Sequence, residues 1–351
     1  MATYKAQQRE QAIQKGMEFI YDIACNPEHF AECGQELLYF FHKIASTSLD
    51  RNLRKLAKGM AQERFQQWQR NKNPLPADAD PDTIIVYYHE DWTAELLGVR
   101  NPVRKRELQE AAKRFTTDDF LWFNPFTEAP ATDMPNTCHC GTWNPRGRKR
   151  CSNRKCNAKL LMMTRYEVWY YSLTRAYCAH SYGLLLGAHY LEVLKWLPSL
   201  YPYPDRQNTS DLEFIDSIYA ISHLVYTLNE YGVYNLSPRW FPREYEFLKA
   251  NLHEAIDLDN PDMMGEILDS LMSFGLTDKH PLIRKGIDFL LFKQNSDGSW
   301  GDAEPDYLYG RYHPTWTAID GLREFAWKGE ALKFPEILPL LKLWAKNDYL
   351  A

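Results

Sequence analysis

Apolar runs long enough to cross a membrane are missing from this sequence, because none approaches 18 residues. The first fifteen residues, MATYKAQQREQAIQK, contain no apolar segment of the kind that begins a secretory signal. The formal net charge is −5, so no general attraction to nucleic acid or to an anionic membrane is expected. We therefore expect a cytoplasmic protein without a membrane span, for which nucleic acid is not an expected partner.

Common nucleotide-binding and nucleophile motifs are also missing. The sequence has no Walker loop, no Rossmann fingerprint, no Gly-x-Ser-x-Gly elbow and no Asp-Asp-x-x-Asp diphosphate motif. Strand signals are scarce, whereas helical periodicity recurs in segments of about 12 to 20 residues. The connections between these segments are short and contain Pro, Gly or Asn. The pattern predicts an all-α chain of paired helices.

Cysteine is too rare for a disulfide scaffold, with seven residues in the chain, but four of the seven are clustered. Cys138-x-Cys140 and Cys151-x4-Cys156 would supply four thiolates from two short loops, which suits tetrahedral Zn²⁺. Such a closed site would be structural, with no open position for a substrate. His139 could replace one cysteine, and a redox pair or incidental cysteines are the alternative interpretations.

Acidic residues are absent between residues 146 and 159, where seven Lys and Arg residues occur. A basic stretch of this kind can bind nucleic acid or another anionic partner. It can also be a solvated loop whose charge partly balances a dianionic zinc–thiolate centre. Because the whole chain is acidic, the second interpretation is favoured at this stage.

Aromatic residues, in contrast, are abundant at 14% of the chain, with 11 Trp and 22 Tyr. One Trp ends a helical segment in an unusual way, KGIDFLLFKQNSDGSWGD at 285–302. The spaced positions are Lys285, Gly286, Phe289, Leu290, Gln294, Gly298 and Trp300. They resemble the QW repeat of squalene and related terpene cyclases. The resemblance implies that Gln294 ties to the backbone of a neighbouring helix end and that the Trp300 ring packs nearby, as a clamp between outer helices of an (α/α) toroid.

Other segments resemble the same repeating unit. Residues 16–27 and 244–256 each look like an outer helix, and 262–276 looks like an inner one. The segment Tyr312-His313-Pro314-Thr315-Trp316 looks like the next inner helix. It is also similar to the Tyr-His-Thr segment of protein prenyltransferase β subunits, in which the His binds catalytic zinc, although Pro314 is an extra residue here.

The fold class implied by the resemblance is an all-α (α/α) toroid with an inserted zinc-ribbon-like loop. Residues 1–136 would form the N-terminal part of the toroid, 137–160 the zinc-binding loop and 161–351 the C-terminal part. A ring of helical hairpins leaves a central cavity. Aromatic side chains lining that cavity would account for their abundance.

Candidate catalytic residues lie on two predicted helices. His223 belongs to a stripe on the helix predicted at 211–232, which would face solvent on an outer helix and the cavity on an inner one, and the solvent-facing interpretation is favoured. Glu266 and Asp269 are three residues apart on the predicted inner helix at 262–276, close enough to act on one centre. Together with His313, these three residues would form a mixed nitrogen and oxygen site for a second metal of unknown identity, or an acid–base set. Surface or capping roles are the alternative. His180 and His189 are further candidates, for which core or surface roles are favoured.

Class II terpene cyclases, which resemble this fold, use an Asp-x-Asp-Asp acid to protonate an alkene. The nearest match here is Asp257-Leu258-Asp259-Asn260, in which Asn replaces the final Asp. The resemblance makes Asp257 and Asp259 candidate acids.

Three functions remain open from the sequence. The first is an enzyme resembling terpene cyclases or prenyltransferases, acting on an apolar, isoprenoid-like substrate. The second is a metal-dependent enzyme using His and carboxylate ligands in the same cavity. The third is a non-catalytic toroid that binds a peptide or another partner.

Overall fold

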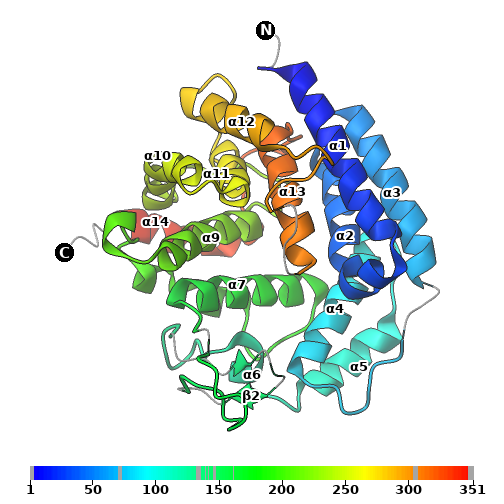
Figure 1. Ribbon diagram of the computed structural model, residues 1–351. Coiled ribbons are helices and arrows are strands. Elements are labelled where there is room, and N and C mark those ends of the chain that lie inside the picture. The colour runs from blue at the N-terminus through cyan, green and yellow to red at the C-terminus, as the bar shows by residue number, and fades with distance from the viewer. Residues whose placement is uncertain are drawn as a thin grey trace. The chain divides into compact units, whose positions relative to one another are not determined.

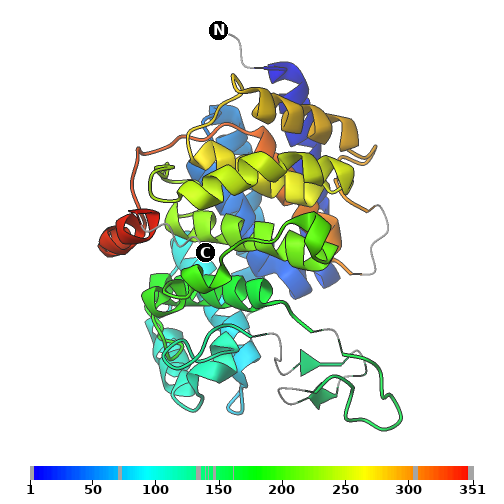
Figure 2. The same ribbon diagram turned by 90° about the vertical axis from the view of Figure 1, so that its left-hand side faces the viewer.

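The computed structural model describes residues 4–69, 73–131, 136–138, 140, 142–144, 148–160, 162–302 and 307–346 (Figures 1 and 2). The chain divides into two compact units. The first unit contains Met1–Pro74, Thr93–Arg100 and Leu224–Ala351, and the second contains Leu75–Trp92 and Asn101–His223. None of the described helices has both the length and the apolar character that a membrane crossing requires.

The first unit is built from helical hairpins. Its helices are α1 (Ala6–Cys25), α2 (Pro27–Thr47), α3 (Arg51–Gln69), α10 (Pro242–Asp257), α11 (Pro261–Ser273), α12 (Pro281–Lys293), α13 (Tyr309–Leu322), the 3₁₀ turn η3 (Pro335–Ile337) and α14 (Leu338–Lys346). Two helices, α4 (Pro81–Leu96) and α9 (Asp211–Leu228), contribute residues to both units. The expected all-α class is confirmed, and these hairpins are consistent with an (α/α) toroid.

The second unit holds the remaining elements. They are α5 (Pro102–Ala112), α6 (Thr117–Leu121), β1 (Asn136–Thr137), β2 (Trp143–Asn144), α7 (Arg165–Tyr182), α8 (Tyr190–Leu194), η1 (Leu197–Leu200) and η2 (Arg206–Asn208). The predicted zinc-binding loop lies within this unit, where β1 and β2 form an antiparallel pair (Figure 2).

Several helix starts follow from local sequence. Asn260 precedes Pro261, and its side chain accepts a hydrogen bond from the Met263 amide at 3.0 Å. An Asn cap satisfies an amide that has no partner within the helix, and Pro suits the first helical position. In the sequence, His313-Pro314 predicts a helix start by the same logic, but this prediction is wrong. Helix α13 begins at Tyr309 and contains Pro314, which places His313 in its second turn.

Close contact between α11 and α13 forms the centre of the first unit. A Cβ atom on Gly265 would lie 2.4 Å from the carbonyl of Thr317, so no larger residue fits there without backbone movement. A Cβ atom on Gly321 would in turn lie 3.2 Å from the Cα atom of Gly265. Glycines on both helices therefore allow the two backbones to approach.

The QW-like ending joins α12 to the first helix of the chain. The Gln294 amide donates to the carbonyls of Ala12 at 2.8 Å and Gly298 at 3.0 Å. The Trp300 ring is fully buried, and its indole N–H donates to the Leu290 carbonyl at 2.7 Å. The backbone tie and the packed ring are as expected, although Ala12 lies inside α1 and not at a helix end. Helix α1 runs beside α13 in Figure 1, which brings distant parts of the chain together.

Gly16 receives the Trp300 ring on α1. A Cβ atom on Gly16 would lie only 2.9 Å from the ring, so the small residue makes room for it. This Gly occurs at the start of the GMEFIYDIACNP segment that resembles an outer helix.

Replacing Trp300 with Ala should lower the free energy of unfolding by about 3 to 5 kcal/mol, because a buried ring and its hydrogen bond are lost. Urea unfolding followed by circular dichroism measures the change. Phe292→Ala on α12 is the control, since Phe292 is 84% exposed and its loss should cost less than about 0.5 kcal/mol. Equal stabilities for the two variants would contradict the clamp.

Candidate functional site

The four predicted cysteines converge in the second unit. Cys138 and Cys140 lie in the turn that follows β1, and Cys151 and Cys156 come from the second loop. The Sγ atoms of Cys138 and Cys156 are 3.7 Å apart, those of Cys140 and Cys151 are 3.6 Å apart, and all four lie within 4.8 Å of one another. A tetrahedral site with zinc–sulfur bonds of about 2.3 Å requires sulfur separations of about 3.8 Å. The four thiols can therefore hold a metal such as zinc.

Backbone hydrogen bonds shape both cysteine loops. The amide of Cys138 donates to the Thr142 carbonyl, and that of Cys151 to the Ala158 carbonyl, each at 2.9 Å. The hydrogen bond with the Thr142 hydroxyl lowers the pKa of Cys140 to about 6, which favours the thiolate that binds metal. His139, proposed as a substitute ligand, lies outside the described residues.

A second group of polar side chains lies in the first unit, where α11 meets α13. Asp262 and Glu266, one turn apart on α11, and His313 on α13 place ligand atoms within 4.8 Å of one another. His313 Nδ1 is 3.0 Å from an Asp262 carboxylate oxygen, and the Thr317 hydroxyl donates to the same oxygen at 2.8 Å. We call Asp262, Glu266, Asp269 and His313 the inner polar group.

The electrostatic state of His313 follows from its partners. Burial by itself would lower the pKa of this imidazole, but the charge and hydrogen bond of Asp262 outweigh burial and raise the pKa to about 9. At neutral pH the two side chains therefore form an ion pair.

Asp269 has a different environment. Its side chain is 4% exposed, and one of its carboxyl oxygens, Oδ1, makes no hydrogen bond within the described residues. Burial, together with the nearby charges of Asp320 and Glu266, raises its pKa well above the ordinary value, while Arg323 acts in the opposite direction. The surroundings of Asp269 thus favour the protonated form of its carboxyl.

Asp320, whose charge acts on Asp269, accepts two hydrogen bonds. The Trp316 indole donates to it at 2.8 Å and the Arg323 guanidinium at 2.6 Å. The charge of Asp320 helps to raise the pKa of Asp269, and the charge of Arg323 acts against it. Arg323 thus acts on both carboxyls and forms an ion pair with Asp320.

Aromatic rings surround the inner polar group. Tyr309 stacks on His313 with ring centres 4.4 Å apart, and Phe40 lies 5.2 Å from Trp316. Tyr226 of α9 lies beside Glu266, and burial followed by the Glu266 charge raises the pKa of its phenol well above the ordinary value. The abundant aromatics thus gather in part around buried acids.

Two of the predicted catalytic residues, Asp257 and Asp259, are exposed near the end of α10. Asp259 forms an ion pair with Lys293 at 2.7 Å, and Asn260 serves as the cap of α11. An exposed, paired carboxylate does not match the dry acid that alkene protonation requires.

His223 belongs to the second unit, whereas Glu266, Asp269 and His313 belong to the first. Its Nδ1 atom lies 2.7 Å from the Tyr219 carbonyl, and its ring stacks on Tyr170 with centres 4.6 Å apart. These neighbours indicate a packed ring on α7 and α9. In the same unit the rings of His180 and His189 lie 5.2 Å apart, and both side chains are exposed.

Sequence reasoning missed Asp262, Asp320 and Tyr226. Asp262 lies in the first turn of α11, where an acidic residue is common and indicates no further role. The missed signal was the spacing of Asp262, Glu266 and Asp269, four and three residues apart, which places all three on one helical face. On α13, His313, Thr317 and Asp320 have the same spacing, four and three residues apart.

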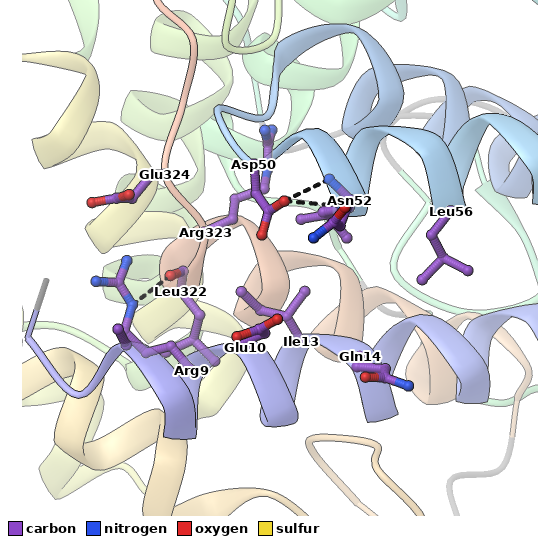
Figure 3. A pocket seen from close by; sticks show the side chains of 12 residues that line it. Arg9, Glu10, Ile13, Gln14, Asp50, Asn52, Leu56, Leu322, Arg323 and Glu324 are labelled. Carbon is purple, nitrogen blue, oxygen red and sulfur yellow. Dashed lines mark hydrogen bonds between the residues drawn. The ribbon is translucent and has the colours of Figure 1, made fainter.

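A pocket of about 350 Å³ lies elsewhere in the first unit, over α1, α3 and the end of α13 (Figure 3). Its lining mixes charged side chains, such as Glu10 and Asp50, with apolar ones, such as Ile13 and Leu56. Arg9 closes one end by donating to the Leu322 carbonyl at 2.7 Å. Arg323 lines this pocket and also binds Asp320 beside the inner polar group.

Replacing Cys138 or Cys151 with Ser should lower metal content and melting temperature together, because metal binding and folding of such a loop are coupled. Mass spectrometry of the purified protein should find about one zinc ion per chain, lost in either variant. Cys25→Ser is the control, since Cys25 is exposed and outside the cluster. Unchanged metal in both cluster variants would refute the site.

The ion pair of Asp262 and His313 predicts a specific pH dependence. Because folding raises the pKa of His313 to about 9 from 6.5, its contribution to stability is complete below pH 6.5 and disappears as pH rises through 9. The loss should be on the order of 2 to 3 kcal/mol in urea unfolding. Asp262→Asn should remove this dependence, whereas His253→Gln on the exposed face of α10 should retain it. A wild-type curve that is flat across this interval would contradict the pair.

The comparisons with known proteins concern the C-terminal part of the chain. No curated protein and no solved structure matches this chain. A family model does match over residues 246–339, which include α11, α12, α13 and most of α10. This segment is similar to the squalene-hopene cyclase C-terminal domain, so the resemblance to the terpene cyclase (α/α) toroid superfamily, expected from the QW-like residues, is confirmed for it.

Proposed function

We propose that the chain is an enzyme that starts a reaction of a small apolar, isoprenoid-like substrate by protonating it, with Asp269 as the proton donor in an aromatic-lined cavity. The observation that supports this most is the buried Oδ1 atom of Asp269, which has no hydrogen bond within the described residues. A buried carboxyl with an unused oxygen is costly unless it stays neutral or serves a function.

The surroundings of Asp269 suit proton donation. Burial raises the pKa of this carboxyl and so favours the acid form that would donate the proton when substrate binds. After the proton leaves, the new carboxylate faces the Arg323 guanidinium, which stabilises the negative charge. Arg323 would thereby offset part of the cost of leaving a buried carboxylate behind.

The rest of the inner polar group suits a positively charged intermediate. Protonation of an alkene forms a C–H bond and leaves a carbocation, which aromatic faces stabilise. Trp316, Tyr309 and Phe40 would supply such faces. The Asp262 carboxylate, paired with His313, would add negative charge and could take up a proton as the cation is quenched. Because one proton is gained and one is lost, the product would be an isomer of the substrate.

The substrate class is inferred from the matching family. The name of that family describes a cyclase of squalene, a polyene without charged groups. Apolar polyenes are bound through buried apolar and aromatic surface, with few polar contacts. A substrate of this class would leave Asp269 in a dry environment when bound.

Metal-dependent catalysis is the second candidate function. The ligand atoms of Asp262, Glu266 and His313 lie within 4.8 Å of one another, and carboxylate and imidazole suit several divalent metals. A metal there would compete with the Asp262–His313 ion pair for the same atoms. A second metal that survives Cys151→Ser would favour this candidate.

Wild-type protein should convert squalene, or a shorter apolar polyene, into products of unchanged mass that gas chromatography with mass spectrometry separates from the substrate. Asp269→Asn keeps the side-chain size but removes the acid, so turnover should fall by about 10² to 10⁴-fold. Glu246→Gln, an exposed carboxyl on α10, is the matched control and should retain activity.

Asp257→Asn and Asp259→Asn complete this experiment by testing the motif interpretation. Loss of product in either of these variants, with Asp269→Asn active, would move the acid to the sequence motif. Full activity of all three variants would reject proton donation by an aspartate at these positions.

A further inference from the structure

The cysteine loop carries a concentrated positive charge that the proposed catalysis does not use. Its described basic residues are all exposed, and we call them the basic ribbon: Arg148, Lys149, Arg150, Arg154, Lys155 and Lys159. No Asp or Glu interrupts residues 146–159, although the chain has 46 acids and 41 bases in total. The net charge of −5 is thus the sum over a chain in which positive charge is concentrated in one loop.

The backbone brings these charges together. Arg150 and Lys159 face each other across an antiparallel bridge, and the Leu160 amide donates to the Lys149 carbonyl at 3.1 Å. Arg154 and Lys155 lie in the intervening turn, which the Asn153 side chain holds by accepting from the Lys155 amide at 3.0 Å. Like charges directly opposite each other on paired strands are destabilising. This arrangement therefore costs stability unless an anion is bound.

The loop interior leaves these side chains pointing outward. Cys138, Cys151 and Leu160 form a small buried cluster, with Cys156 and Ala158 packed against it. The hydrogen bonds of the Arg148 and Arg150 guanidinium groups go to the carbonyls of Arg150 and Asn157, and not to cysteine sulfurs. These arginines are exposed and are not fixed onto the cysteine sulfurs by the hydrogen bonds described, so their charge is accessible to an external anion.

We propose that the basic ribbon binds the phosphate backbone of a nucleic acid without reading its sequence. Arginine matches phosphate oxygens with two parallel donors, and a linear polyanion can contact the paired strands and the turn at once. None of the exposed side chains described at 148–160 is apolar, so the surface lacks the anchors that favour a membrane. The acidic remainder of the chain has a limited effect, because salt screens charges beyond about 8 to 10 Å.

Fluorescence anisotropy tests the proposal with the full-length, metal-loaded protein and labelled single-stranded and duplex oligonucleotides of about 20 residues, long enough for several phosphate contacts. Binding should weaken steeply with potassium chloride, with a slope that corresponds to about three to five phosphates. The double variant Arg154→Glu/Lys155→Glu should weaken binding by at least about 10-fold.

The matched control reverses two exposed charges on α3, Lys55→Glu/Lys58→Glu, and should change the affinity by less than about twofold. Zinc content of each variant shows whether the cysteine loop is intact. If Arg154→Glu/Lys155→Glu loses metal, Lys149→Ala/Lys159→Ala replaces it, with the same expected direction.

Three results would overturn the proposal. They are no binding at low salt, equal weakening by the control pair, and binding to phosphatidylserine vesicles but not to either oligonucleotide. Because these residues and the inner polar group lie in different units, Asp269→Asn should leave oligonucleotide binding unchanged. A failure of nucleic-acid binding would therefore be separate from a failure of the proposed catalysis.

Discussion

The close approach of α11 and α13 is the contact on which the first unit depends. Gly265 and Gly321 remove the Cβ atoms that would separate the two backbones. Only at this distance can Asp262 on one helix reach His313 on the other at 3.0 Å. The same approach places Glu266 in the interior, and Trp300 then joins α12 and α13 to α1 by packing against Gly16. Backbone packing thus determines the electrostatics of the candidate site.

Several carboxyl groups are brought into one weakly hydrated region by this packing, and their partners differ. Asp262 and Asp320 pair with cationic side chains, His313 and Arg323. Asp269 is buried near other acids, which raises its pKa well above the ordinary value. Environments that separate the pKa values of neighbouring acids are the physical basis of acid–base catalysis. Burying several acids together lowers the stability of the fold. The proposed role in proton transfer therefore explains these buried acids better than a purely structural role does.

The second unit obeys a different physical constraint. The cysteine loop has a very small apolar interior, so a metal bound by four thiolates would supply much of its folding free energy. Such a loop can carry an excess of positive charge on its surface, because a metal–thiolate centre does not depend on the solvent-facing side chains. The chain thereby combines an acidic, aromatic-rich helical unit with a compact basic surface.

Local spacing was sufficient to predict much of this molecule. Helical periodicity predicted the all-α class and the cysteine spacing predicted the convergent thiols, because both depend on residues close in sequence. The resemblance of residues 285–300 to a QW repeat predicted the contacts of Gln294 and Trp300. Tertiary structure alone decided the rest. Asp262 and His313 are 51 residues apart, Asp269 is buried while Asp257 is exposed, and His223 lies in a different unit from His313. A helical stripe shows which residues share a face, but the helix packed against that face determines whether they meet water, a ring or an opposite charge.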